Sequence, residues 1–188
     1  MTSHIIGVVI RDGRPEEVEA IARVNVQAWR ETYSGLVSDE LLAEIFEERK
    51  SVRQRFFEKR DPTARLLVVE AADQIVGFAE GGACRQKELG TEAEIYAIYL
   101  LDEAKRQGIG RQLMVSLFEH LRAKRFASAG LFVLVSNTPA RRFYEALGGT
   151  PGPERTLDVK GIPLSEVAYR FDLGVQEGAS QLGQQVGH

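Results

Sequence analysis

The stretch EIYAIYLLDEAKRQGIG, residues 94–110, decides the fold of this chain. It begins with alternating apolar residues that predict a β-strand over 95–101, passes through a polar turn, and ends in two glycines. Five apolar residues then follow at helical spacing: Leu113, Met114, Leu117, Phe118 and Leu121. A strand, a glycine turn and a helix N-terminus together predict a phosphate-binding site. The free amides of the first helical turn and the helix dipole both attract an anion.

Composition indicates one α/β domain. The chain has 188 residues, 27% of them charged and 44% hydrophobic, with a net charge of −3. We expect a domain over 1–173 and a flexible tail rich in Gly, Gln and Ser over 174–188. The charge gives no reason to expect a nucleic-acid partner, and no apolar run reaches the roughly 18 residues of a membrane-spanning helix.

The compartment and the absence of a metal are also expectations from residue types. The single cysteine, Cys84, and the lack of a secretory signal favour the cytoplasm. Cys84 itself is interpreted as a buried strand residue rather than a nucleophile, because no histidine is near it in sequence. His4, His120 and His188 have no ligand spacing, so no metal is predicted.

The remaining segments predict strands and helices on both sides of the central stretch. Strands are expected over 5–11, 65–71, 75–83 and 131–135, and in two runs around the Lys160-Gly161 turn. Helices are expected over 16–33, 38–46, 52–59, from Gly108 to near Arg125, and over 138–147 with Thr138 as N-cap. This order predicts a mixed sheet of about seven strands with helices on both faces.

Two blocks of sequence together resemble one family. Residues 105–110, KRQGIG, resemble the acyl-CoA loop of the GNAT superfamily of N-acetyltransferases, Gln/Arg-x-x-Gly-x-Gly/Ala, with lysine at the first position. Residues 137–148, NTPARRFYEALG, look like the family's later unit Asn-x-x-Ala-x-x-Phe-Tyr-x-x-x-Gly. Residues 28–35, AWRETYSG, resemble a frequent version of its first helix and loop. The resemblance covers about residues 5–173.

The resemblance implies the GNAT fold, in which a mostly antiparallel sheet splays open between its fourth and fifth strands. Acetyl-CoA is the implied co-substrate, with its pantetheine arm in the splay and its pyrophosphate on the glycine loop. The implied cofactor-binding residues are Ile98, Tyr99, Leu100, Lys105, Arg106, Gln107, Gly108, Ile109, Gly110, Arg111, Asn137 and Tyr144. A homodimer is a further family expectation.

The implied reaction is direct transfer of acetyl from the thioester to a primary amine, with a small-molecule amine favoured. A protein N-terminal or lysine amine, and a non-catalytic acyl-CoA sensor, are the alternatives. Tyr144 would protonate the leaving thiolate, and an amide at Ile98 or Tyr99 would polarise the thioester carbonyl. Glu94 lies 14 residues before Gly108 (108 − 94), the position of the glutamate base in the histone-acetyltransferase branch.

The acceptor-binding site and the roles of several candidate residues each have more than one interpretation. Trp29, Glu31, Tyr33 and Tyr96 are the candidate acceptor-binding residues. For Trp29 and Tyr33, core packing competes equally with lining the acceptor site. Taken alone, Glu94 fits a solvated edge residue and Tyr144 a half-buried core tyrosine.

Overall fold

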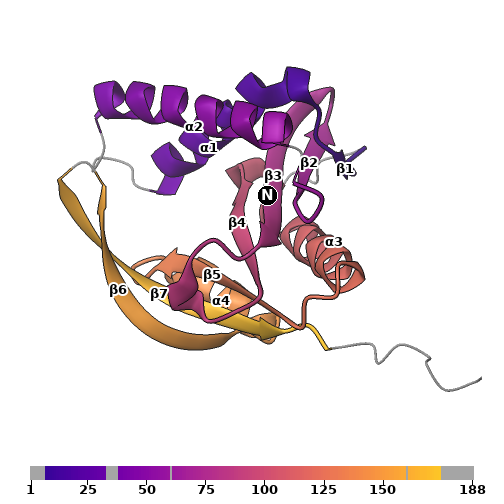
Figure 1. Ribbon diagram of the computed structural model, residues 1–188. Helices are drawn as coiled ribbons and strands as arrows, with labels where there is room; N and C mark the ends of the chain where they lie inside the picture. The colour runs from indigo at the N-terminus through magenta and orange to yellow at the C-terminus, as the bar shows by residue number, and fades with distance from the viewer. Residues whose placement is uncertain (1–6, 33–37, 60, 160, 175–188) are drawn as a thin grey trace, which may run out of the picture.

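Seven strands form one mixed sheet in the computed structural model, which describes residues 7–32, 38–59, 61–159 and 161–174 (Figure 1). The strand order is β1-β2-β3-β4-β5-β7-β6. The strands are β1 (Val9–Asp12), β2 (Arg65–Ala71), β3 (Gln74–Ala83), β4 (Ala93–Leu100), β5 (Ser128–Leu134), β6 (Thr150–Val159) and β7 (Ile162–Asp172). The helices are α1 (Val18–Thr32), α2 (Asp39–Lys59), α3 (Ile109–Ala123) and α4 (Thr138–Ala146). The predicted sheet of about seven strands is confirmed.

The pairing of β4 with β5 divides the sheet into two parts. This pair is parallel, whereas the other five strand pairs are antiparallel. It consists of two rungs only, Ala93 opposite Ala129 and Glu94 opposite Gly130. Beyond Glu94 the two strands separate, which agrees with the predicted splay between the fourth and fifth strands.

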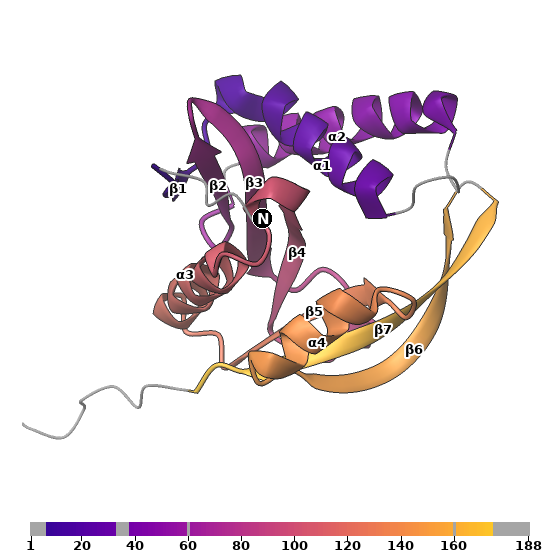
Figure 2. The ribbon, with the colours of Figure 1, turned by 180° about the vertical axis from the view of Figure 1, so that it is seen from behind.

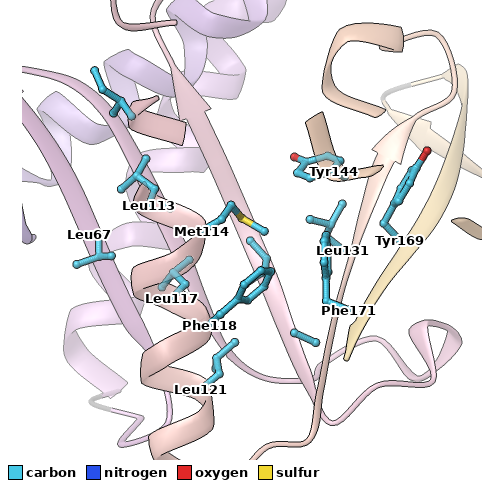
Figure 3. Close-up of a cluster of buried hydrophobic side chains, with 14 of the residues drawn as sticks. Leu67, Leu113, Met114, Leu117, Phe118, Leu121, Leu131, Tyr144, Tyr169 and Phe171 are labelled. Atoms are coloured by element: carbon cyan, nitrogen blue, oxygen red, sulfur yellow. The ribbon is translucent and has the colours of Figure 1, made fainter. Parts of the chain in front are cut away.

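Alternate residues of the strands pack against helices on opposite faces of the sheet. Leu66, Val68 and Phe78 form a cluster with Ile21 and Val24 of α1. The neighbouring strand residues belong to a larger cluster with α3 and α4, shown in Figure 3. Its members include Leu67, Leu113, Met114, Leu117, Phe118, Leu121, Leu131, Tyr144, Tyr169 and Phe171. Figure 2 shows α3 and α4 on the side of the sheet that is turned away in Figure 1. Helices on both faces are confirmed.

The N-terminal third differs from the sequence prediction in its helices. The segments predicted as two helices, 38–46 and 52–59, are one helix, α2. Residues 47–51, EERKS, contain no glycine or proline, so nothing interrupts the backbone hydrogen bonds between the two apolar runs. The first strand begins at Val9, and a 3-10 turn over Pro15–Glu17 precedes α1. Tyr33 and the predicted tail beyond Gly174 lie outside the described residues.

The β2–β3 hairpin has the expected tight connection. Ala72 and Asp73 both have positive φ, 47° and 60°, as a two-residue turn matched to the strand twist requires. Within the described ranges, no helix combines the length and the apolar character needed to cross a membrane.

Candidate active site

The loop between β4 and α3 presents free backbone amides at a helix N-terminus. A 3-10 turn over Asp102–Ala104 leads from β4 into the loop, and Gly108 is the N-cap of α3 with φ 78°. The first hydrogen bond of the helix runs from Gln112 N to Gly108 O, 3.1 Å. The amides of Ile109, Gly110 and Arg111 therefore have no acceptor within α3. Free amides at a helix N-terminus are suited to hold an anion, and they occur where the sequence predicts a phosphate-binding loop.

Glycine occupies positions 108 and 110 of this loop for different structural reasons. Gly108 has a positive φ, and a Cβ there would meet nothing within 4 Å. Gly110 lies in the first turn of α3, where a Cβ would stand 3.3 Å from Phe143 Cζ and 3.4 Å from Leu100 Cδ1. Gly108 is thus required by backbone conformation. Gly110 is required by the close packing of α3 against α4 and β4.

The basic residues of the loop divide into a paired lysine and two unpaired arginines. Lys105 Nζ lies 2.6 Å from Asp102 Oδ1 and 3.7 Å from Glu31 Oε2. The bond from Lys105 holds the pKa of Asp102 below its ordinary value. Arg106 and Arg111 are exposed and form no ion pair with the described residues. A phosphate at this loop would therefore meet the two arginines before the lysine.

The register of β3 and β4 determines which backbone groups of β4 face the splay. Leu101 N donates to Val76 O, 2.9 Å, which makes these residues a hydrogen-bonded pair of the antiparallel ladder. Hydrogen-bonded pairs alternate along such a ladder, so Tyr99 is again bonded to β3. The backbone groups of Ile98 and Leu100 point away from β3 towards the splay. Of the two amides predicted to polarise the thioester carbonyl, the ladder turns that of Tyr99 to β3 and leaves that of Ile98 on the side of the splay.

Tyr144 combines a buried ring with a free hydroxyl. Its ring is 7% exposed and packs against Phe143, Tyr169 and Phe171 at centroid distances of 5.3, 5.8 and 6.4 Å. Figure 3 shows its hydroxyl pointing from α4 towards the side of α3 and β4. The hydroxyl makes no hydrogen bond within the described ranges. Burial raises the pKa of Tyr144 above its ordinary value, so the phenol stays protonated at neutral pH.

Asn137 is the N-cap of α4, a role that the sequence prediction gave to Thr138. Asn137 Oδ1 accepts a hydrogen bond from Ala140 N, 3.2 Å. Thr138 instead occupies the first helical position, and Pro139 follows it. Since the cap uses the side-chain oxygen, the amide nitrogen of Asn137 is left as a donor towards a ligand.

Glu94 is buried, with a relative exposure of 2%, so its interpretation as a solvated edge residue is wrong. Its Oε2 accepts a hydrogen bond from Arg85 N, 2.9 Å, and its Oε1 accepts one from Gln86 Nε2, 2.7 Å. The carboxylate thus anchors the loop that follows β3. An ionised carboxylate has about four lone-pair sites, so these bonds leave acceptor capacity.

Of the candidate acceptor residues, Trp29, Glu31 and Tyr96 lie within the described ranges, and each has a different partner. Trp29 Nε1 donates to Tyr99 Oη, 3.2 Å, which joins α1 to β4 next to Ile98. Tyr96 Oη donates to Ala83 O, 2.6 Å, so its hydroxyl is directed back to β3. Glu31 reaches the loop before α3 instead of an open acceptor pocket.

Sequence reasoning missed the Tyr99 hydroxyl and a buried ion pair. Tyr99 was expected to act through its backbone, yet strand alternation puts its ring on the α1 face beside Phe78, 5.5 Å between centroids. Arg53 of α2 and Glu80 of β3 form an ion pair with Nε and Oε2 3.1 Å apart. One sequence signal could have indicated this ion pair: a glutamate, Glu80, stands within the apolar run 75–80, IVGFAE.

Two further side-chain predictions concern Cys84 and metals. Cys84 is half-buried just after β3, and its Sγ donates to Gln86 O, 3.2 Å. Among the residues that the structure describes, no three His, Cys, Asp or Glu side chains are grouped to hold a metal ion.

Comparison with known proteins agrees with this geometry. Residues 24–149 match the model of the acetyltransferase (GNAT) family. The uncharacterized N-acetyltransferase YuaI of Bacillus subtilis is 32% identical over 164 residues, 85% of this chain and 90% of that protein. Mycothiol acetyltransferase of Saccharopolyspora erythraea is 33% identical over 75% of this chain, which spans 43% of that protein. The PaiA N-acetyltransferase of Thermoplasma acidophilum, solved with coenzyme A, superposes with a TM-score of 0.64 at 22% identity, covering 86% of this chain and 98% of that one. The matched family model and the similarity to YuaI show that this chain belongs to the acetyltransferase (GNAT) family.

Proposed function

We propose that this acyl-CoA-dependent acetyltransferase transfers the acetyl group of acetyl-CoA to a small-molecule primary amine by direct attack. The observation that carries the proposal is the free backbone edge of β4 at Ile98 and Leu100, together with the free, buried hydroxyl of Tyr144. The edge offers donors and acceptors to the pantetheine amides. The hydroxyl offers a proton to the thiolate.

The residues divide the chemical step among themselves. The amine nitrogen forms a bond to the thioester carbon, and the carbon–sulfur bond breaks. The Ile98 amide donates a hydrogen bond to the carbonyl oxygen as negative charge develops there. Tyr144 gives its proton to the departing sulfur, and the amine loses its own proton to a base or to water. The amides of residues 109–111, with Arg106 and Arg111, hold the pyrophosphate, and the Asn137 amide holds the pantetheine arm.

Removal of the amine proton is assigned to Glu94, directly or through water. An alkylamine with a pKa of about 10.4 is almost wholly protonated at neutral pH, so the reaction needs such a base. Glu94→Gln keeps the size of the side chain and removes the base. We expect the ratio of wild-type to variant kcat to change with pH. A ratio that stays constant from pH 6 to pH 9 would reject this role.

A thiol-release assay over a panel of amines tests the proposed function. Turnover of small diamines, amino acids or amino sugars supports it. Turnover of peptides through their N-terminal or lysine amines, with none for small amines, would assign the protein to the protein acetyltransferases. The sensor alternative is favoured by the two hydrogen bonds that occupy Glu94. Tight acetyl-CoA binding with no thiol release for any amine would establish the sensor.

A further inference from the structure

Charged side chains of both signs gather on the α1 and α2 face of the sheet around Glu80. Arg49 and Arg53 are one helical turn apart on α2, so both project from the same face of that helix. Arg53 pairs with Glu80, and its Cζ lies 4.8 Å from the centroid of Phe78. Burial raises the pKa of Glu80, and the charges of Arg53, Arg85 and Arg49 act against that rise. Three guanidinium groups therefore lie close to this carboxylate, and a second carboxylate, Glu94, is also close enough to act on it.

Buried atoms in this group have no hydrogen-bond partner among the described residues. They include Arg49 Nε, Arg53 Nε and Glu80 Oε2. The Arg53 and Glu80 side chains are only 4% and 2% exposed, and their contact is an ion pair without hydrogen-bond alignment. An unpaired polar group costs about 1 to 3 kcal/mol when it is removed from water. Arg49 has no carboxylate of its own here, because Glu80 is already paired with Arg53.

Arg85 adds an exposed guanidinium beside this buried group. Its Cζ lies 3.3 Å from the centroid of the Tyr96 ring, which fixes the side chain by stacking. The side chain is 55% exposed, and its Nε is 4.0 Å from Glu94 Oε2, too far for a hydrogen bond. The Asp61 carboxylate is also near enough to interact with the charge of Arg85, but it accepts hydrogen bonds from Thr63. The planar fork of Arg85 is thus held in place by stacking and by a long ion pair, and its side chain donates no hydrogen bond to the residues that the structure describes.

The position of Arg85 relates it to the acetyl-transfer site. Its backbone amide bonds Glu94, the residue of the last β4–β5 rung before the strands separate. Tyr96, under the guanidinium, precedes Ile98 by two residues, which is roughly 7 Å along a strand. This separation is comparable to the distance between the amine and the carboxylate of an extended ω-amino acid, and it exceeds that distance in an α-amino acid.

We propose that Arg85, supported by Arg49 and the Arg53–Glu80 pair, binds a carboxylate of the acceptor, so that the substrate class is amines that also carry a carboxylate. The inference rests on the proposed function and specifies its acceptor. A guanidinium pairs with a carboxylate through two parallel hydrogen bonds and orients it as well as attracting it.

Matched acceptors test the proposal. Thiol release is measured for several α- and ω-amino acids, for the carboxamide of each, and for putrescine. We expect the acids to have KM values about 10- to 100-fold lower than those of their amides, the equivalent of one or two charged hydrogen bonds. The α-amides have less basic amines, so a larger fraction of each is neutral at the assay pH, and a lower KM for the acid therefore points to binding of its carboxylate. Equal or better use of amides or putrescine would overturn the proposal while leaving acetyl transfer established.

Variants locate the carboxylate site. Arg85→Gln and Arg49→Gln should each raise the KM for acids about 10-fold or more, with no change for amides or in the KM for acetyl-CoA. Arg55→Gln, an exposed change on α2, is the matched control. A loss shared equally by acids and amides would show that these arginines only support the fold.

Turnover of no amine would reject the proposed function. In that case the binding of the acceptors to the protein provides a second readout. Calorimetric titration of the same acids and amides into the CoA-loaded protein then decides the inference. Binding of an acid that Arg85→Gln abolishes supports it. Absence of binding by every acid overturns it.

Discussion

Glu31 of α1 accepts a hydrogen bond from the backbone amide of Asp102, 3.0 Å, and so fastens the acceptor-side helix to the loop before α3. Gln27 Nε2 donates to the other oxygen of Glu31, 3.2 Å. The same carboxylate lies 3.7 Å from Lys105. One residue of α1 therefore helps to set the shape of the proposed pyrophosphate loop.

Removal of this contact should weaken cofactor binding. Glu31→Ala is expected to raise the Kd for acetyl-CoA about 3- to 10-fold, since one charged hydrogen bond that orders the loop is lost. Glu31→Gln keeps an acceptor for the Asp102 amide and should have a smaller effect. Calorimetric titration measures both. Glu19→Ala, in the first turn of the same helix, is the control, and an equal loss in that variant would count against the assignment.

Packing at the start of α3 makes a prediction for Gly110. Gly110→Val places side-chain atoms against Phe143 and Leu100, so we expect α3 to shift and the Kd for acetyl-CoA to rise at least about 10-fold, with a loss of about 1 to 3 kcal/mol in unfolding free energy. Equilibrium binding and urea unfolding measure these changes. Gly152→Val is the control, because a Cβ there makes only an ordinary contact of 3.5 Å with Ala168. Unchanged affinity in Gly110→Val would contradict the loop assignment.

The role of Tyr144 can be tested through pH. Because burial raises its pKa above the ordinary 10.0, the phenol keeps its proton across the alkaline range in which an exposed tyrosine loses it. The wild-type kcat should therefore show no decline from loss of the phenol proton up to pH 10. Tyr144→Phe should lower kcat by about 100-fold or more and change acetyl-CoA affinity little. A decline in wild-type kcat with an apparent pKa below 10, absent from Tyr144→Phe, would reject the raised pKa.

The buried ion pair makes a prediction for stability. Glu80→Ala leaves Arg53 as an uncompensated buried charge, so the free energy of unfolding should fall by about 3 to 5 kcal/mol. The double variant Arg53→Met with Glu80→Leu removes both charges and should recover most of that loss. Urea unfolding measures each variant, with the exposed Glu58→Ala as control. A single variant as stable as the wild type would show that the pair does not hold α2 to the sheet.

The features that could be predicted from the sequence are those that depend on the spacing of residues close together in the chain. The strand, glycine turn and helix over 94–121 follow from apolar periodicity, and the motif residues Asn137 and Tyr144 follow from a fixed spacing in one helix. The order of these elements predicts a mixed sheet with helices on both faces, and the resemblance to the GNAT superfamily implies the antiparallel pairing and the splay.

The features that were missed depend on contacts between distant segments. Whether Ile98 or Tyr99 turns its amide to the splay is determined by pairing with β3, which no local pattern contains. Glu94 is buried because the loop between β3 and β4 folds onto it, and Glu80 is paired because a residue of α2 reaches it. The N-cap of α4 was displaced by one residue, because asparagine and threonine can both cap a helix and only the backbone angles choose between them.

The two-rung connection between β4 and β5 has a consequence for how the domain holds together. A ligand that bonds to Ile98 and Leu100 would occupy the place of a missing strand and bridge the two halves of the sheet. Ligand at 100 times its Kd adds about 2.7 kcal/mol to the free energy of unfolding of a protein that binds it only when folded. Here that energy would be concentrated at one seam, so amide exchange should slow on both sides of it when the site is filled. Acetyl-CoA, which is consumed in each cycle, would then also hold the two halves of the sheet together.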